Sequence, residues 1–473
     1  MASIPFEVIE IIFKNLYTDS YPKLADLAVA CSLVCRSWRP ITQSSFFLGA
    51  IKRPLPKKVN SFPPELVEII LEYLFGLYPM VTLPGFLLNC SLVCRSWHLI
   101  AQSIMFSVVV LPSTFTRWGK IIPALKRNPT LFQYVRCVLV VNIRTAELGT
   151  IIDLLPHLRR VSIIQGLSCY RSLRESTTDA LIKVGMNLTS LHLAKVLDFP
   201  IDVFYSCSAL RELKCRDTTF LPPTTDGLHN PRARLKSLFI NAPHFPGIEI
   251  LRWFCQPQCA FDLSELATFG CMGCPKEIEG HELVKQFIHL VSPSIQDLAI
   301  NPPAEYAVSN YHISSESFLY TKRLYNLRSL RLWADLKSGS ETDRRNHVPW
   351  VLSFFNSLLR HDTLEEISIP CFLSIDPTRP EEIIEEIRSF QLSQLDDLFT
   401  SSKFTALKKV TIGVSVWYDA EAPNKNHILE RAFGEAFPRL RERKILGIIF
   451  PEVAGYMSYE ECWWKTPYQL RAT

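Results

Sequence analysis

A triad of apolar residues with the spacing Leu-x-x-Leu-x-Leu recurs through most of this 473-residue chain and constrains its fold more than any other feature. Eight clear copies begin at Leu158, Leu188, Leu210, Leu235, Ile295, Leu327, Leu364 and Leu407. The last two apolar residues of each copy alternate with other residues, which predicts a short strand with one buried face. Leu263 and Leu266 suggest a further, poorly formed copy.

Helical patterns of apolar residues lie between these strands. The clearest span residues 178–184, 249–254, 282–291, 349–359, 381–399 and 428–437. Before the first triad we expect a strand at 108–111, a helix at 118–127 and a strand at 134–143. Strands and helices that alternate at a repeated interval form a parallel sheet with helices on one side. Residues 107–444 are therefore expected to form an α/β array of parallel strands and irregular helices.

This array resembles a degenerate leucine-rich-repeat solenoid. The later copies lie farther apart than in regular repeats. The Asn that usually closes each turn is absent at most copies, although Asn241 and Asn301 lie nearby. We therefore expect an irregular arc with insertions. Residues 445–473 are rich in aromatic side chains, including Trp463 and Trp464, which favours a cap over the apolar end of a solenoid.

An eight-residue identity marks the first quarter of the chain. Cys31–Trp38 and Cys90–Trp97 both read Cys-Ser-Leu-Val-Cys-Arg-Ser-Trp. Each follows a segment that has a proline at its second position and the apolar spacing of a helix, at residues 4–12 and 62–74. Such an identity with matching flanks indicates a tandem duplication.

Each copy carries more apolar surface than it can bury alone. In the second copy, Leu66, Ile69, Ile70 and Leu74 share one helical face. A helical unit of under ~50 residues has too little volume for a self-sufficient core. The surplus indicates that a partner covers part of this surface.

A helix that begins with a proline, followed by Leu-Val-Cys-Arg-x-Trp, resembles the F-box, a small helical module that docks on the Skp adaptor of cullin–RING ubiquitin ligases. Phe62-Pro63 stands where the family usually has Leu-Pro. The resemblance implies that one set of residues in each copy contacts the adaptor. These are Phe62, Pro63, Leu66, Ile69 and Ile70 in the second copy and Ile4, Pro5, Val8, Ile11 and Ile12 in the first. Cys94, Trp97, Cys35 and Trp38 are expected in the cores of the modules.

The expected organisation has five parts. They are a first F-box-like module at 1–47, a basic Pro-containing linker at 48–61, a second module at 62–106, the solenoid at 107–444 and an aromatic cap at 445–473. The whole resembles the fungal-type F-box proteins with leucine-rich repeats. The linker's Lys and Pro residues favour a solvated, extended segment over a localisation signal.

Composition narrows the function classes. Hydrophobic residues make up 48% and charged residues 21% of the chain, which is typical of globular domains. A net charge of +5 that is spread along the chain does not demand a nucleic-acid partner. No apolar run reaches the ~18 residues that a membrane-spanning helix needs. Fourteen cysteines without a signal peptide are typical of a reducing compartment, so we expect a cytoplasmic or nuclear protein.

One cysteine cluster has metal-like spacing. Cys255, Cys259, Cys271 and Cys274 could hold zinc tetrahedrally, but buried cysteines that act as small apolar side chains are the favoured interpretation. Cys31, Cys35, Cys90 and Cys94 lie on helix faces beside tryptophans and are expected in cores. The chain has no phosphate-binding Gly loop, Gly-x-Ser-x-Gly elbow or His-Glu-x-x-His helix. We therefore expect no catalytic residues, no metal and no cofactor.

The resemblance implies a substrate-recognition subunit that binds the Skp adaptor through an F-box and an unidentified protein target through the repeats. The second copy is the favoured adaptor site because it is joined directly to the repeats. Adaptor binding by both copies, or one copy that is a relic and packs on the other, stays open. One alternative function is a ligase-independent interaction scaffold. Another is a zinc-binding or hydrolytic enzyme centred on Cys255–Cys274.

Overall fold

The computed structural model describes thirteen stretches of the chain. They are residues 95–111, 123, 127–141, 147–165, 171–224, 232–241, 250–272, 278–301, 321–337, 345–358, 360–374, 380–416 and 425–450. Helix α6 (Arg95–Ser107) belongs to one compact unit, and the described residues from Val109 onward belong to a second. The predicted first module, the linker and residues 62–94 lie outside the described residues.

A large and mostly parallel sheet lies in the second unit, apart from Val108 at the start of its first strand. Its strands include β1 (Val108–Leu111), β2 (Cys137–Val141), β3 (Arg160–Ile164), β5 (Ser190–Ala194), β8 (Glu212–Arg216), β11 (Ser237–Asn241), β13 (Thr268–Met272), β14 (Asp297–Ile300), β15 (Ser329–Leu332), β18 (Glu366–Ser374), β19 (Lys409–Val416) and β20 (Leu446–Ile449). These strands lie side by side in chain order, and every described pairing from β2 to β20 along this series is parallel. Such a one-directional progression is solenoid-like.

Several shorter strands pair at the edge of this series or apart from it. After β15, β16 (Ala334–Lys337) pairs in parallel with the second half of β18 and forms an antiparallel hairpin with β17 (Arg345–Asn346). Three two-residue pairs stand apart from the large sheet. They are β4 (Arg171–Ser172) with β6 (Val196–Leu197), β7 (Phe199–Pro200) with β9 (Phe220–Leu221), and β10 (Ala233–Arg234) with β12 (Phe261–Asp262).

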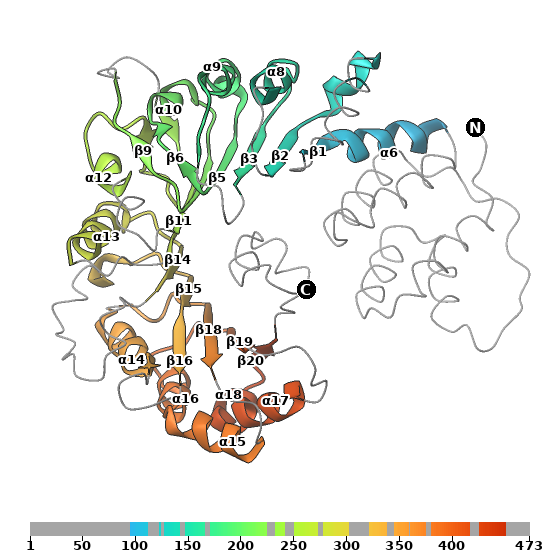
Figure 1. Ribbon diagram of the computed structural model, residues 1–473. Coiled ribbons are helices and arrows are strands. Elements are labelled where there is room, and N and C mark those ends of the chain that lie inside the picture. Colours follow the sequence, from blue (N-terminus) through green and yellow to red (C-terminus); the bar gives the residue numbers. More distant parts are fainter. Residues whose placement is uncertain are drawn as a thin grey trace, which may run out of the picture. The chain divides into compact units, whose positions relative to one another are not determined.

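Helices return the chain from one strand to the next along one side of the sheet (Figure 1). They are α8 (Glu147–Asp153), α9 (Glu175–Val184), α10 (Asp202–Ser206), α12 (Ile250–Phe254), α13 (Ile278–Val291), α14 (Val348–Ser357), α15 (Pro380–Ser389), α16 (Ser393–Thr400), α17 (Lys425–Ala436) and α18 (Pro438–Glu442), with 3₁₀ turns η1 (Pro129–Tyr134) and η2 (Gly185–Asn187). Within the described stretches, no helix has the length and apolar character to cross a membrane.

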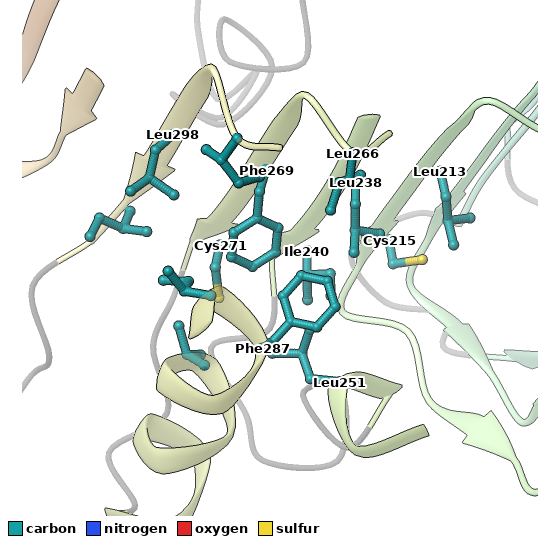
Figure 2. Close-up of a cluster of buried hydrophobic side chains, with 14 of the residues drawn as sticks. Leu213, Cys215, Leu238, Ile240, Leu251, Leu266, Phe269, Cys271, Phe287 and Leu298 are labelled. Carbon is teal, nitrogen blue, oxygen red and sulfur yellow. The ribbon is translucent and has the colours of Figure 1, made fainter. Parts of the chain in front are cut away.

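The core lies between the sheet and these helices. Because the strands are in register, equivalent triad residues form rows across the sheet, as in Leu213, Leu238, Phe269 and Leu298. Figure 2 shows these side chains on the same side of their strands as Phe287 of α13. The Phe269 and Phe287 ring centroids lie 4.8 Å apart, and both side chains are fully buried. Burial of this apolar surface is the main force that holds strands and helices together.

Most of the predicted helices form, with shifted ends. The predicted helix at 381–399 is instead two helices, α15 and α16, because the chain turns between them at Gln391, which has a positive φ of 57°. Helices α8, α10 and α18 were not predicted. Most of the predicted helix at 118–127 lies outside the described residues.

The poorly formed triad at Leu263 and Leu266 was placed wrongly. The strand is β13, where Phe269 pairs with Leu238 and Cys271 pairs with Ile240, so the true copy is Leu266-x-x-Phe269-x-Cys271. Phe269 and Cys271 are buried in place of the usual aliphatic residues. Leu263 is only partly buried and packs at the edge of the core.

The predicted strands at 108–111 and 134–143 form as β1 and β2, and β20 adds a strand that was not predicted. Val138 and Val140 of β2 pair with Val161 and Ile163, which adds a triad that starts at Val135. At the other end, β20 pairs with β19, so residues 446–449 of the predicted cap form part of the sheet. Residues 451–473 lie outside the described residues.

Candidate functional site

Helix α6 is the described part of the second helical module. Ala101 and Ile104 are buried, whereas Leu99 is 58% exposed. The buried pair continues, at helical spacing, the face predicted for Cys94 and Trp97. The ten predicted adaptor-contacting residues all lie outside the described residues, as do Cys35, Trp38 and Cys94.

The second candidate site is the face of the large sheet that points away from the core. Side chains that alternate with the triad residues occupy this face, which we call the open face. Its central row consists of Ser162, His192, Lys214, Phe239, Gly270, Ala299, Arg331, Ser368 and Thr411. The strand order thus brings together residues that are far apart in the chain.

Polar contacts join neighbouring strands at β3, β5 and β8. The Ser162 hydroxyl lies 2.9 Å from Nδ1 of His192. The Ser190 hydroxyl donates a hydrogen bond to the Glu212 carboxylate at 2.8 Å. The Lys214 ammonium forms an ion pair with the same carboxylate at 2.8 Å. These contacts fix the side chains in place, which favours recognition of a partner with little loss of side-chain entropy.

Electrostatics keeps His192 neutral. Burial, together with the positive charges of Lys214 and Arg216, lowers the pKa of His192 to about 4. In the same cluster, the Lys214 cation and hydrogen bonds from Lys214 and Ser190 outweigh burial and hold the pKa of Glu212 below its usual range. Ser162 and His192 have the spacing of a nucleophile and its base, but a histidine with so low a pKa is a weak general base near pH 7.

An aromatic residue continues the row. The Lys214 ammonium lies 5.6 Å from the centre of the Phe239 ring, which is within the range of a cation–π contact. The Phe239 ring in turn lies over Gly270, where a Cβ atom would come within 2.3 Å of ring atom Cδ1. The absence of a side chain at position 270 therefore leaves room for the Phe239 ring on the neighbouring strand.

A second charged group lies on β14, β15 and β18. Burial lowers the pKa of Arg331, while the negative charges of Asp297 and Glu366 act in the opposite direction. The Thr268 hydroxyl donates to Asp297 at 3.2 Å. The open face therefore carries charges of both signs, of which Lys214 is buried, beside an aromatic ring, an arrangement suited to binding a protein surface.

The cysteines of the predicted zinc cluster occupy different environments. Cys255 is exposed, whereas Cys259 and Cys271 are buried in the apolar core. Burial raises the pKa of the Cys259 thiol to about 12, which opposes the thiolate form that binds zinc. Cys274 lies outside the described residues. Among the side chains that the structure describes, no group of three or more His, Cys, Asp or Glu residues could hold a metal ion.

Comparison with known protein families places an F-box domain in this chain. Residues 59–108 match the F-box domain family. The match covers the second copy, including α6, and extends the predicted module of 62–106 by three residues at its start and two at its end. A search of curated proteins gives no match to the chain.

The F-box defines a general class of protein. F-box domains typically bind Skp-type adaptors of cullin–RING ligases, and this one implies a general role in substrate recognition by SCF ubiquitin ligases. The sequence motifs around Pro63 and Trp97 were sufficient to find this domain. The open-face residues Phe239 and Arg331 were missed, because their only sequence signal is an alternate position within a triad.

Proposed function

We propose that this protein is the substrate-recognition subunit of an SCF-type ubiquitin ligase. Its F-box would dock on the Skp-type adaptor, and the solenoid-like unit would bind a protein target on the open face of its sheet. The match of residues 59–108 to the F-box family carries this proposal. We further propose that the parallel strands are degenerate leucine-rich repeats and that the protein acts in the cytoplasm or nucleus.

In this function the chain performs no bond chemistry. It raises the effective concentration of a target near a catalytic subunit of the ligase, which can increase the rate of transfer without any new catalytic group. Fixed polar groups such as Glu212 and Lys214 suit such a role because they are already ordered before the partner binds.

We infer that the second copy is the principal adaptor site. Phe62, Pro63, Leu66, Ile69 and Ile70 are its proposed contact residues. The family match falls on this copy. Residues 1–47 are proposed to be a duplicated F-box-like module, in which Ile4, Pro5, Val8, Ile11 and Ile12 occupy the equivalent positions.

Co-purification of the adaptor with the full-length protein tests this assignment. The double variant Pro63→Asp/Leu66→Asp should lose the adaptor, since charged side chains would have to be buried in an apolar interface. The matched variant Pro5→Asp/Val8→Asp should retain it. If only the matched variant loses the adaptor, the first copy is the docking module.

A ligase-independent scaffold is the main alternative, and it predicts that the wild-type chain recovers no adaptor under conditions in which an established F-box protein does.

The zinc-binding or hydrolytic alternative predicts stoichiometric zinc in the purified protein, which elemental analysis would detect. Burial of Cys259 and Cys271 in the core supports the interpretation without zinc.

A further inference from the structure

A second row of backbone contacts runs along the end of the sheet at which the strands begin. In each copy, the residue just before the first strand position donates its N–H to the carbonyl of its equivalent in the preceding copy. The residues in this series are Arg136, Arg159, Thr189, Arg211, Lys236, Ala267, Gln296, Arg328, Glu365 and Lys408, and their N···O distances are 2.8–3.0 Å. We call this row the amino-terminal rim.

Basic side chains dominate the rim. Six of these ten described positions hold Arg or Lys, namely Arg136, Arg159, Arg211, Lys236, Arg328 and Lys408, and all six are exposed. The residue just before each rim position is the first apolar residue of a triad, and its side chain is buried in most copies. The backbone therefore turns the rim residue outward to solvent. The regular backbone therefore makes neighbours of rim residues that lie 22–43 positions apart in the chain.

The rim is most uniformly basic between β2 and β11. Arg136, Arg159, Arg211 and Lys236 occupy four of its five positions there, and Thr189 is neutral. None of these four cations forms an ion pair within the described residues. Glu212, the first residue of β8, is the acidic residue that directly follows Arg211. Its carboxylate already forms an ion pair with Lys214 at 2.8 Å and accepts a hydrogen bond from Ser190 at 2.8 Å.

The other end of the rim differs. Ala267 and Gln296 interrupt the charge after Lys236. Beyond them, Glu365 pairs with Lys408 at 2.6 Å. Arg328 is an isolated exposed cation beside Glu365, so the longest run of positive charge on the rim extends from β2 to β11.

We propose that the rim from Arg136 to Lys236 binds an extended acidic segment of a protein partner. Four strand spacings of ~4.8 Å give a basic run of roughly 19 Å. An extended polypeptide covers that length with about six residues, at ~3.3–3.6 Å each. Opposite charge along such a run favours encounter and register with an acidic segment.

The identity of the partner as a protein rests on the proposed function. The limited length of the basic run also favours a protein partner. A nucleic-acid backbone carries a charge at every phosphate and would run on past Lys236 to the neutral Ala267 and Gln296. A short run of Asp and Glu residues matches the length of the basic segment.

Fluorescence anisotropy with the purified full-length protein tests the proposal without the adaptor. The probe is a labelled ten-residue peptide rich in Glu, and the reference is the same peptide with Gln at each Glu. We expect the Glu peptide to bind and the Gln peptide to bind much more weakly. The triple variant Arg159→Gln/Arg211→Gln/Lys236→Gln should reduce affinity for the Glu peptide by about tenfold at low salt and less at high salt.

A matched variant controls for net charge. Arg323→Gln/Lys403→Gln/Arg441→Gln removes the same three charges from exposed positions outside this run and should leave affinity nearly unchanged. Equal losses in both variants, or equal binding of the Gln peptide, would overturn the proposal. Tighter binding of a single-stranded oligonucleotide of equal charge through the same three residues would assign the rim to nucleic acid instead.

The test separates this inference from the proposed function. Thermal unfolding of both triple variants checks that they fold, and we expect little change because the rim side chains are exposed. If the protein does not bind the Glu peptide but still co-purifies with the adaptor, the result bears only on the rim proposal. Failure of adaptor co-purification, with peptide binding intact, would concern only the F-box.

Discussion

At the residue scale, His192 should make stability depend on pH. Its pKa is lowered from 6.5 to about 4 by burial and by the nearby Lys214 and Arg216, with Glu212 opposing them. The unfolded chain therefore binds more protons between these pH values, and stability falls as pH decreases from about 6.5 to about 4. The full loss from this one group is up to about 3 kcal/mol.

The variant His192→Gln isolates this contribution. Glutamine can keep a hydrogen bond to Ser162 but does not titrate. Chemical denaturation at pH 7 and pH 4 should show that the wild type loses more unfolding free energy than the variant. Parallel losses in the two proteins would mean that His192 is solvated in solution.

Cysteine reactivity is a second prediction at this scale. Burial raises the pKa of Cys207, Cys259 and Cys371 to about 12, so these thiols are both protonated and shielded. Cys255 is exposed. Brief alkylation of the native protein, followed by peptide mass mapping, should modify Cys255 well before the three buried thiols.

Zinc provides the control for the cysteine experiment. If Cys255 belongs to no metal site, added zinc should leave its rate of alkylation unchanged. Protection of Cys255 together with Cys274 by one equivalent of zinc would instead support the metal-binding alternative.

At the scale of elements, two helical glycines should respond in opposite ways to alanine. A Cβ atom at Gly149 in α8 would lie 2.5 Å from the Ser176 carbonyl oxygen of α9, so Gly149→Ala must push the helices apart. We expect a loss of about 1–3 kcal/mol.

Gly434 in α17 is the matched case. A Cβ there would have Arg441 Nη1 as its nearest neighbour, at 3.5 Å, which is an ordinary contact. Gly434→Ala should therefore raise stability by about 0.5–1 kcal/mol through helix propensity. Thermal unfolding of both variants measures the two effects, and a similar loss in both would show that close packing does not separate these sites.

The elements also indicate which parts of the fold were predictable. Strands with alternating aliphatic residues, such as β5 (Leu191 and Leu193) and β11 (Leu238 and Ile240), were found because their burial on every second residue is visible within a few consecutive residues. β13 was misplaced because Phe269 and Cys271 fill aliphatic positions while Leu263 imitates one. α10 has five residues, which is too short for a helical period to register. The break at Gln391 depends on one backbone torsion that periodicity does not encode.

The candidate sites also differ in how far the sequence could predict them. The F-box could be predicted because its motif is local in sequence. The contact between Ser162 and His192 joins residues 30 positions apart and depends on the register of β3 and β5. The rim likewise needs the alignment of several strands before Arg159 and Arg211 become part of one surface.

At the scale of the whole molecule, the F-box and the solenoid-like unit should bind their partners independently. Val108 and Val109 belong to different compact units, each with its own internal contacts. Since the F-box match ends at 108, the two proposed functions divide at the same place in the chain. An adaptor-binding variant should therefore leave the basic rim intact, and a rim variant should leave the F-box intact.

A bridging assay tests this independence. Wild-type protein should retain the labelled Glu peptide on immobilised adaptor, because one chain binds both. Pro63→Asp/Leu66→Asp should abolish retention while the anisotropy of the free variant still reports peptide binding. Arg159→Gln/Arg211→Gln/Lys236→Gln should bind the adaptor normally yet retain about tenfold less peptide at subsaturating concentration. If either variant lost both activities while remaining folded, the two sites would be energetically coupled, and recognition of the target could not be treated as a separate function of the sheet.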